Sequence, residues 1–140
     1  MKQESLELFK SAKIEEILEI LKNGLDSRNE AAFWADKVVP FSEAILSILI
    51  PLRDSGKLFN PENKHVDELT PELFFAWNDF VSLKSLAFTI QKSPDLGVDL
   101  EILGNYLARY NVNLEDENLD FPISHYNLHQ GVSNVIKSLL

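Results

Sequence analysis

Apolar residues recur at the spacing of an α-helix along most of the chain, and no segment alternates with the period of two that marks a strand. The first such segment covers about residues 6–22, where Ile14 and Leu18 share one face and glutamates occupy the other. Asn23 and Gly24 predict its end, because glycine adopts the left-handed conformation after a helix at little cost. We therefore expect an amphipathic first helix that packs through one face.

The longest predicted helix follows, from a capping-box pattern at Ser27 and Glu30 to about Asp54. Its apolar residues cover most of its sides, which is typical of a central helix that packs on several neighbours. Pro40 and Pro51 should each kink or split it, since proline lacks an amide donor and clashes with the preceding turn. The apolar seam continues through Pro40, which favours a kink there. The seam consists of Trp34, Val38, Phe41, Ile45, Ile48 and Leu52.

The next helical segment begins at a strong start signal, with Thr70 as the N-cap and Pro71 at the first helical position. Asn78 and Asp79 can divide the segment into two helices, and the Ser-Pro pair at 93–94 ends it. Its inward seam consists of Ala76, Phe80, Leu83, Ala87 and Ile90.

Two further helices are predicted in the last third of the chain. Asp99 can cap the first, which continues to about Tyr110, and Ser124 is a candidate N-cap for the second. The second is still in register at Leu140, as if cut from a longer helix. We therefore expect the two chain ends on the same side of the fold, about 10–25 Å apart. The inward positions are Leu100, Leu103, Leu107 and Tyr110 in the first helix, and Leu128, Val132, Val135 and Leu139 in the second.

Together these segments predict an all-α fold, a compact bundle of about five to seven helices around one central apolar helix. A chain of 140 residues can bury about two-thirds of its unfolded surface in a single core. We expect Trp34, Ile45, Ile48 and Leu83 in that core, because they belong to the apolar seams. The longest apolar run, residues 44–52, is shorter than the roughly 20 residues that a bilayer span needs.

The composition restricts the function further. With 13 basic and 22 acidic residues the formal charge is −9, which disfavours strong binding to nucleic acid or to an anionic membrane. The absence of cysteine excludes disulfides and thiol chemistry. The sequence contains no phosphate-binding glycine motif, hydrolase elbow or zinc-protease motif. We therefore predict no catalytic residues and no cofactor, and an enzyme is the least favoured class.

His125 and His129 are spaced i, i+4 on the last predicted helix and could hold a metal with a third ligand such as His65 or Asp120. Spacing fixes no further ligand, so we favour partly buried histidines that form hydrogen bonds, and predict no metal site. Several aromatic residues could form a stacking platform for bases, but their helical spacing favours core packing. They are Trp34, Phe74, Phe75, Trp77 and Phe80.

A series of helix-end, aromatic and proline residues follows a recognisable order along the chain. It consists of Leu21-Lys22-Asn23-Gly24, Phe33-Trp34-Ala35-Asp36-Lys37, Leu52-Arg53-Asp54, Glu68-Leu69-Thr70-Pro71-Glu72-Leu73, Tyr106-Leu107, and His129 near Gly131. This order resembles the all-alpha domain of type IV coupling proteins, the TraD/TraG-type ATPases of conjugation and type IV secretion. The resemblance covers about residues 18–140, although Gln130 separates the His-Gly pair of that family.

The resemblance implies a particular anatomy. The domain would be inserted in the RecA-like motor of a hexameric ATPase anchored in the bacterial inner membrane, and would face the cytoplasm. Residues 1–26 would form a linker helix, and residues 27–140 the helical core of a single domain. The isolated domain is expected to be a monomer without direct membrane contact. Members of the family use this domain to receive cargo such as relaxases, relaxosome proteins or effector proteins.

Three functional hypotheses remain open. The first is a module that docks protein cargo at the cytoplasmic entrance of the motor, without covalent chemistry. The second is a DNA-binding domain at the motor pore, for which the acidic charge predicts weak binding at most. The third is a regulatory or structural helical protein unrelated to secretion.

The expected contacts lie in two loops, residues 57–67 and 113–120, because loops on a rigid scaffold commonly carry binding residues. The acidic residues of the second loop either recognise a basic partner or form a solvated surface that maintains solubility. The candidate contacts are Lys57, Asn60, Lys64, Glu115, Asp116, Glu117 and Asp120.

Overall fold

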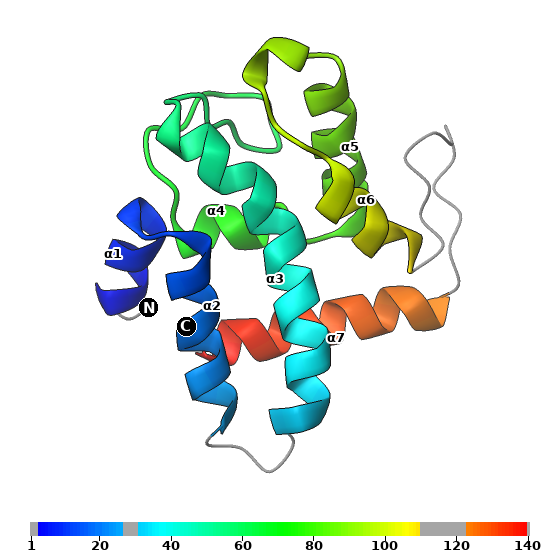
Figure 1. Ribbon diagram of the computed structural model, residues 1–140. Coiled ribbons are helices and arrows are strands. Elements are labelled where there is room, and N and C mark those ends of the chain that lie inside the picture. The colour runs from blue at the N-terminus through cyan, green and yellow to red at the C-terminus, as the bar shows by residue number, and fades with distance from the viewer. Residues whose placement is uncertain (1–2, 27–30, 110–122, 140) are drawn as a thin grey trace.

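The computed structural model describes residues 3–26, 31–109 and 123–139, and every regular element in these ranges is a helix (Figure 1). The all-α fold predicted from the sequence is therefore confirmed. The elements are α1 Gln3–Ser11, α2 Ile14–Asp26, α3 Ala31–Asp54, α4 Pro71–Ala76, α5 Phe80–Gln91, the 3-10 helix η1 Pro94–Leu96, α6 Glu101–Ala108 and α7 Ile123–Leu139.

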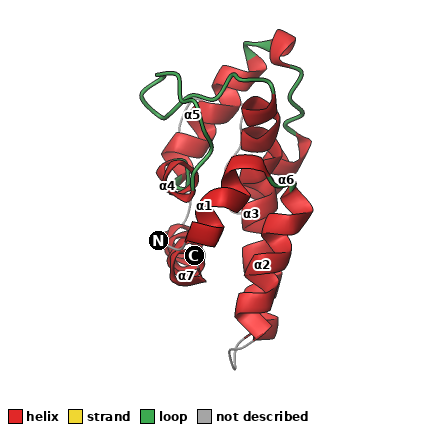
Figure 2. Cartoon of the chain, turned by 90° about the vertical axis from the view of Figure 1, so that its left-hand side faces the viewer, coloured by secondary structure: helices red, strands yellow, loops and turns green. Residues whose placement is uncertain are grey.

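The central apolar helix is α3, which contacts α2, α4, α6 and α7 (Figures 1 and 2). Ile45 and Ile48 of this helix and Leu83 of α5 are fully buried, as predicted. The side chain of Trp34 lies outside the described part of the structure. The helix is continuous through both of its prolines, so neither splits it.

The first predicted helix is in fact two helices, and this part of the prediction is wrong. The chain breaks between α1 and α2, where the Glu16 side chain accepts a hydrogen bond from the Lys13 amide. The break turns Phe9 inward against the ring of Phe74, with centroids 5.6 Å apart, while α2 packs on α3. Helix α2 also continues through Gly24, the predicted end. Burial of Phe9 therefore accompanies a break that periodicity alone did not predict.

The predicted helix starts at Thr70 and near Asp79 are confirmed by cap geometry. The Thr70 hydroxyl accepts from the Leu73 amide at 3.1 Å, and Asp79 Oδ1 accepts from the Ser82 amide at 3.0 Å. The predicted inward seam of this segment is wrong at Ala76, because this residue ends α4 and is exposed at the break before α5.

Replacing Asp79 by alanine should lower the free energy of unfolding by about 1 kcal/mol, the usual effect of losing an N-cap. Asp79 also accepts from the Ser82 hydroxyl at 2.9 Å, so both of its oxygens stabilise the first turn of α5. Urea denaturation followed by circular dichroism measures the change. Asp95→Ala is the control, since Asp95 is an exposed acid in the first turn of η1 and not at its N-cap position. Equal midpoints for the two variants would contradict the assigned role.

The last two helices lie where they were predicted, but α7 begins at Ile123 and so includes Ser124, its predicted N-cap, and its buried face also differs from the prediction. Asp99 Oδ1 accepts from the Glu101 amide at 2.9 Å at the start of α6, whereas Tyr110 lies outside the described residues. In α7 the buried positions include Ile136, whereas the predicted Val135 is only partly buried. The inward face of α7 is shifted from the predicted one because it also contains two polar residues, His129 and Ser133. The described buried positions of α7 are His129, Val132, Ser133 and Ile136.

The beginning of α1 and the end of α7 lie on the same side of the molecule in both views (Figures 1 and 2). Met1 and Leu140, on which the prediction about the chain ends was made, lie outside the described residues. None of the helices in the described ranges combines the length and the hydrophobicity that crossing a bilayer requires.

Candidate functional site

The first predicted contact loop is anchored to the core. Asn60 Oδ1 accepts from the amides of Glu62 at 2.9 Å and Lys64 at 3.0 Å, so this side chain shapes the turn rather than projecting from it. Lys57 and Lys64 are exposed, and Lys64 lies 4.0 Å from Glu62. Positive and negative charges therefore alternate on this loop and form no single-sign patch.

The second predicted contact loop, with Glu115, Asp116, Glu117 and Asp120, lies outside the described residues. Only the first of the two predicted loops can therefore be placed on the fold.

The aromatic residues pack in the core where their side chains are described. Phe74 and Trp77 are buried, and the Trp77 indole donates to the Phe59 carbonyl at 3.2 Å. Phe75 is partly buried against the same core. The described members of this group thus do not form an open platform for bases.

His129 is buried with both ring nitrogens in hydrogen bonds. A carbonyl can only accept, so Nε2 carries the proton and donates to the Asn78 carbonyl. Nδ1 is then the acceptor, and the Tyr106 hydroxyl donates to it at 2.8 Å. The favoured interpretation, a histidine that forms hydrogen bonds, is confirmed for His129, whereas the side chain of His125 lies outside the described residues.

Burial lowers the pKa of His129 to about 4, because the charged form loses its hydration. The hydrogen bond to Asn78 and the charge of Asp79 oppose this shift but do not cancel it. Asn78 also donates to the Ser133 hydroxyl at 3.0 Å, so the cluster joins the start of α5 to α6 and α7. We call Asn78, Tyr106, His129 and Ser133 the histidine cluster.

An open pocket of about 450 Å³ lies between α2, α3 and α6. Its walls are mainly apolar, with Ile50 and Pro51 from α3 facing the side chains of α2. Apolar walls are stabilised when they lose contact with water, so this pocket can accept an apolar surface of another molecule. Residues that line it include Ile14, Glu15, Leu18, Glu43, Ile50 and Ile102.

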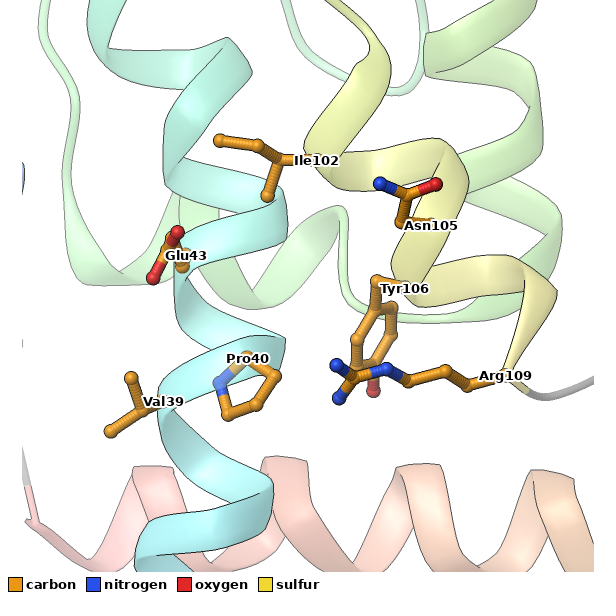
Figure 3. Close-up of a pocket in the computed structure, with 7 residues that line it drawn as sticks. All are labelled: Val39, Pro40, Glu43, Ile102, Asn105, Tyr106 and Arg109. Carbon is orange, nitrogen blue, oxygen red and sulfur yellow. The ribbon is translucent and has the colours of Figure 1, made fainter.

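A second pocket of about 300 Å³ lies further along α3, against α6 (Figure 3). Glu43 and Ile102 line both pockets, so the two form one continuous surface, which we call the α3 groove. The Arg109 side chain extends from α6 toward Pro40 on the opposite wall (Figure 3). Tyr106 also lines this second pocket, which connects the groove to the histidine cluster. The other lining residues are Val39 and Asn105.

The groove carries three charges that form no ion pair with any other described residue. Glu15, Glu43 and Arg109 have no ion-pair partner within the described ranges. Glu43 is partly buried between apolar neighbours, where an opposite charge from another molecule is screened less than on the open surface. The groove as a whole therefore offers a concave shape, apolar contacts and charges for ion pairs, which are the interactions by which one protein binds another.

The sequence did not predict the groove, and for the histidine cluster it predicted a hydrogen-bonded His129 but none of its partners. A signal for the groove was present, since Val39, Glu43, Ser47 and Ile50 recur every three or four residues and share one side of α3. Polar residues on the inward side of the last helix were the corresponding signal for the cluster.

No protein-family model, curated protein or solved structure matches the chain significantly.

Proposed function

We propose that this domain recognises a protein partner through the α3 groove and carries out no covalent chemistry. The observation that supports the proposal is an open, largely apolar surface on rigid helices, edged by charges that lack partners in the described structure. Helical grooves of this kind suit helix-in-groove docking, in which apolar anchors enter pockets and charges set the register.

In the more specific form of the proposal, the chain is the cargo-docking domain of a type IV coupling protein. The support is the ordered residue pattern that runs from about Leu18 to the last helix. The domain would then face the cytoplasm at the entrance of a membrane-anchored hexameric motor, and its partners would be relaxase, relaxosome or effector proteins.

Electrostatics favour protein over DNA as the partner. Affinity for a duplex rises with the number of phosphates that Lys and Arg neutralise, and the chain has 13 such residues against 22 acids. Glu15 and Glu43 in the groove would repel phosphate. We therefore retain DNA binding at the motor pore only as the alternative function.

The test is a pair of titrations at about 0.15 M salt, where non-specific DNA binding typically reaches only about 10⁻⁴–10⁻⁶ M. Fluorescence anisotropy would follow labelled single-stranded and double-stranded DNA, and calorimetry would follow purified relaxase and effector proteins encoded beside the chain's gene. We expect protein binding with a dissociation constant of about 10⁻⁶ M or lower, and DNA binding weaker than this. Sub-micromolar DNA binding without protein binding would favour the alternative.

A further inference from the structure

We infer that the α3 groove takes an amphipathic helical segment of the partner, with basic side chains on Glu43 and Glu15 and an acidic side chain opposite Arg109. This inference rests on the proposed function and names the chemistry of its partner. It follows from the length of the groove, its apolar walls and the order of the charges along it.

The groove has the dimensions of a short helix. Its α3 lining runs from Val39 to Pro51, which corresponds to about 18 Å at the rise of an α-helix, or roughly three turns. Helices α2 and α6 flank α3 on either side of this surface (Figure 1). A partner helix laid along α3 would therefore contact both flanking helices.

The apolar contacts come from both walls. Ile50 and Val39 are partly buried against the core and still line the open surface. Ile102 of α6 is 40 % exposed at the junction of the two pockets. A large apolar side chain left exposed between two pockets is the position at which an apolar anchor of the partner would remove most surface from water.

The charges of the groove favour a partner helix with a basic face and determine the direction in which that helix lies along α3. Glu43 lies where the two pockets meet, Glu15 on the α2 side, and Arg109 at the far end of α6. A helix with lysine or arginine at its middle would satisfy Glu43, and an acid near one of its ends would satisfy Arg109. Charge order of this kind fixes orientation more than it increases affinity.

Two other occupants fit these charges less well. A second copy of this chain would bring another formal charge of −9 to a surface that already contains Glu15 and Glu43. The chain's own residues 110–122 carry Glu115, Asp116, Glu117 and Asp120, which could pair with Arg109 but have the wrong sign for both Glu15 and Glu43.

The experiment uses the full chain and two synthetic amphipathic peptides of about four helical turns each. One has leucines at i, i+3, i+4 and i+7 with lysines on the other positions, and the second has glutamate in place of every lysine. Nuclear magnetic resonance titration would give the dissociation constants and locate the perturbed amides. We expect the lysine peptide to bind and to perturb α2, α3 and α6, and the glutamate peptide to bind at least about tenfold more weakly.

Matched variants separate the groove from the general acidity of the chain. Ile102→Asp should weaken binding of the lysine peptide at least about tenfold, whereas Val81→Asp, on a residue 63 % exposed on α5, should not. Glu43→Gln should weaken binding of the lysine peptide about fivefold. Glu62→Gln removes the same charge from a side chain 75 % exposed in the loop and should have no effect. Circular dichroism would confirm that each variant is folded.

The outcomes distinguish this inference from the proposed function. Equal binding of the two peptides, equal effects of Ile102→Asp and Val81→Asp, or perturbed amides away from α2, α3 and α6 would each overturn the inference. Dimerisation that Ile102→Asp abolishes in sedimentation would assign the groove to a second copy instead. If natural cargo binds but its affinity is unchanged by Ile102→Asp, recognition of a protein partner stands, but the groove is not its site and the inference fails. If the peptide binds the groove but no cargo or other protein does, the proposed function fails.

Discussion

Truncating Ile48 to alanine should lower the free energy of unfolding by about 2–5 kcal/mol, the range observed when a buried isoleucine or leucine is cut to a methyl group. Ile48 is completely buried on α3, the helix that contacts α2, α4, α6 and α7. The lost methylene groups leave a cavity that close-packed neighbours on several helices can fill only in part. Chemical denaturation followed by circular dichroism measures the change.

Ile50→Ala is the matched control, because it removes the same atoms from the same helix two residues further on. Ile50 is only partly buried and lines the α3 groove, so its truncation leaves less of a closed cavity. We expect a loss of about 1 kcal/mol for this variant, with the same denaturant dependence as the wild type. If Ile48→Ala and Ile50→Ala shifted the midpoint equally, the assignment of a buried and an open side to α3 would be wrong.

The helical fold was predictable because periodicity and cap chemistry are local properties. Thr70 and Asp79 announce helix starts through side chains that accept from amides three residues on, and the structure has both bonds. The break between α1 and α2 was not predictable in the same way. It is associated with the contact of Phe9 with Phe74, residues far apart in the sequence.

The α3 groove escaped prediction because α3 is apolar on most sides. A hydrophobic pattern shows that a helix packs on several neighbours, but it does not show which side lacks one. In the structure Val39 and Ile50 are partly buried against the core and also line the open surface between α2 and α6. The binding contacts were predicted in loops, whereas the pockets of the structure lie on helices.

The histidine cluster escaped prediction for the opposite reason. His129 and Ser133 are polar, so hydrophobic periodicity assigned the inward face of α7 to a neighbouring stripe that included Val135. In the structure the hydroxyl of Tyr106 and the carbonyl of Asn78 satisfy His129, which removes most of the cost of burying it. Burial of a neutral histidine depends on partners that only tertiary structure supplies.

This burial should make stability depend on pH. Burial lowers the pKa of His129 from 6.5, its ordinary value, to about 4 in the folded protein. Below pH 6.5 the unfolded chain therefore takes up a proton that the folded protein does not, and unfolding becomes more favourable. The stabilising contribution is complete above pH 6.5 and is lost progressively as the pH falls to about 4. A shift of this size corresponds to about 3 kcal/mol in the free energy of unfolding.

Carboxylates also titrate in this range, so the measurement is the difference between the wild type and His129→Gln in denaturation at several pH values. The glutamine amide can still donate to the Asn78 carbonyl but takes up no proton in this pH range. The free energy of unfolding of the variant should therefore fall less between pH 6.5 and 4 than that of the wild type. His65→Gln replaces an exposed histidine on the loop before α4 and controls for the loss of an imidazole as such. Parallel pH profiles for the wild type and His129→Gln would show that His129 is not held neutral by the fold. The same profiles, if they diverge only for His129→Gln, would assign the acid sensitivity to the burial of His129.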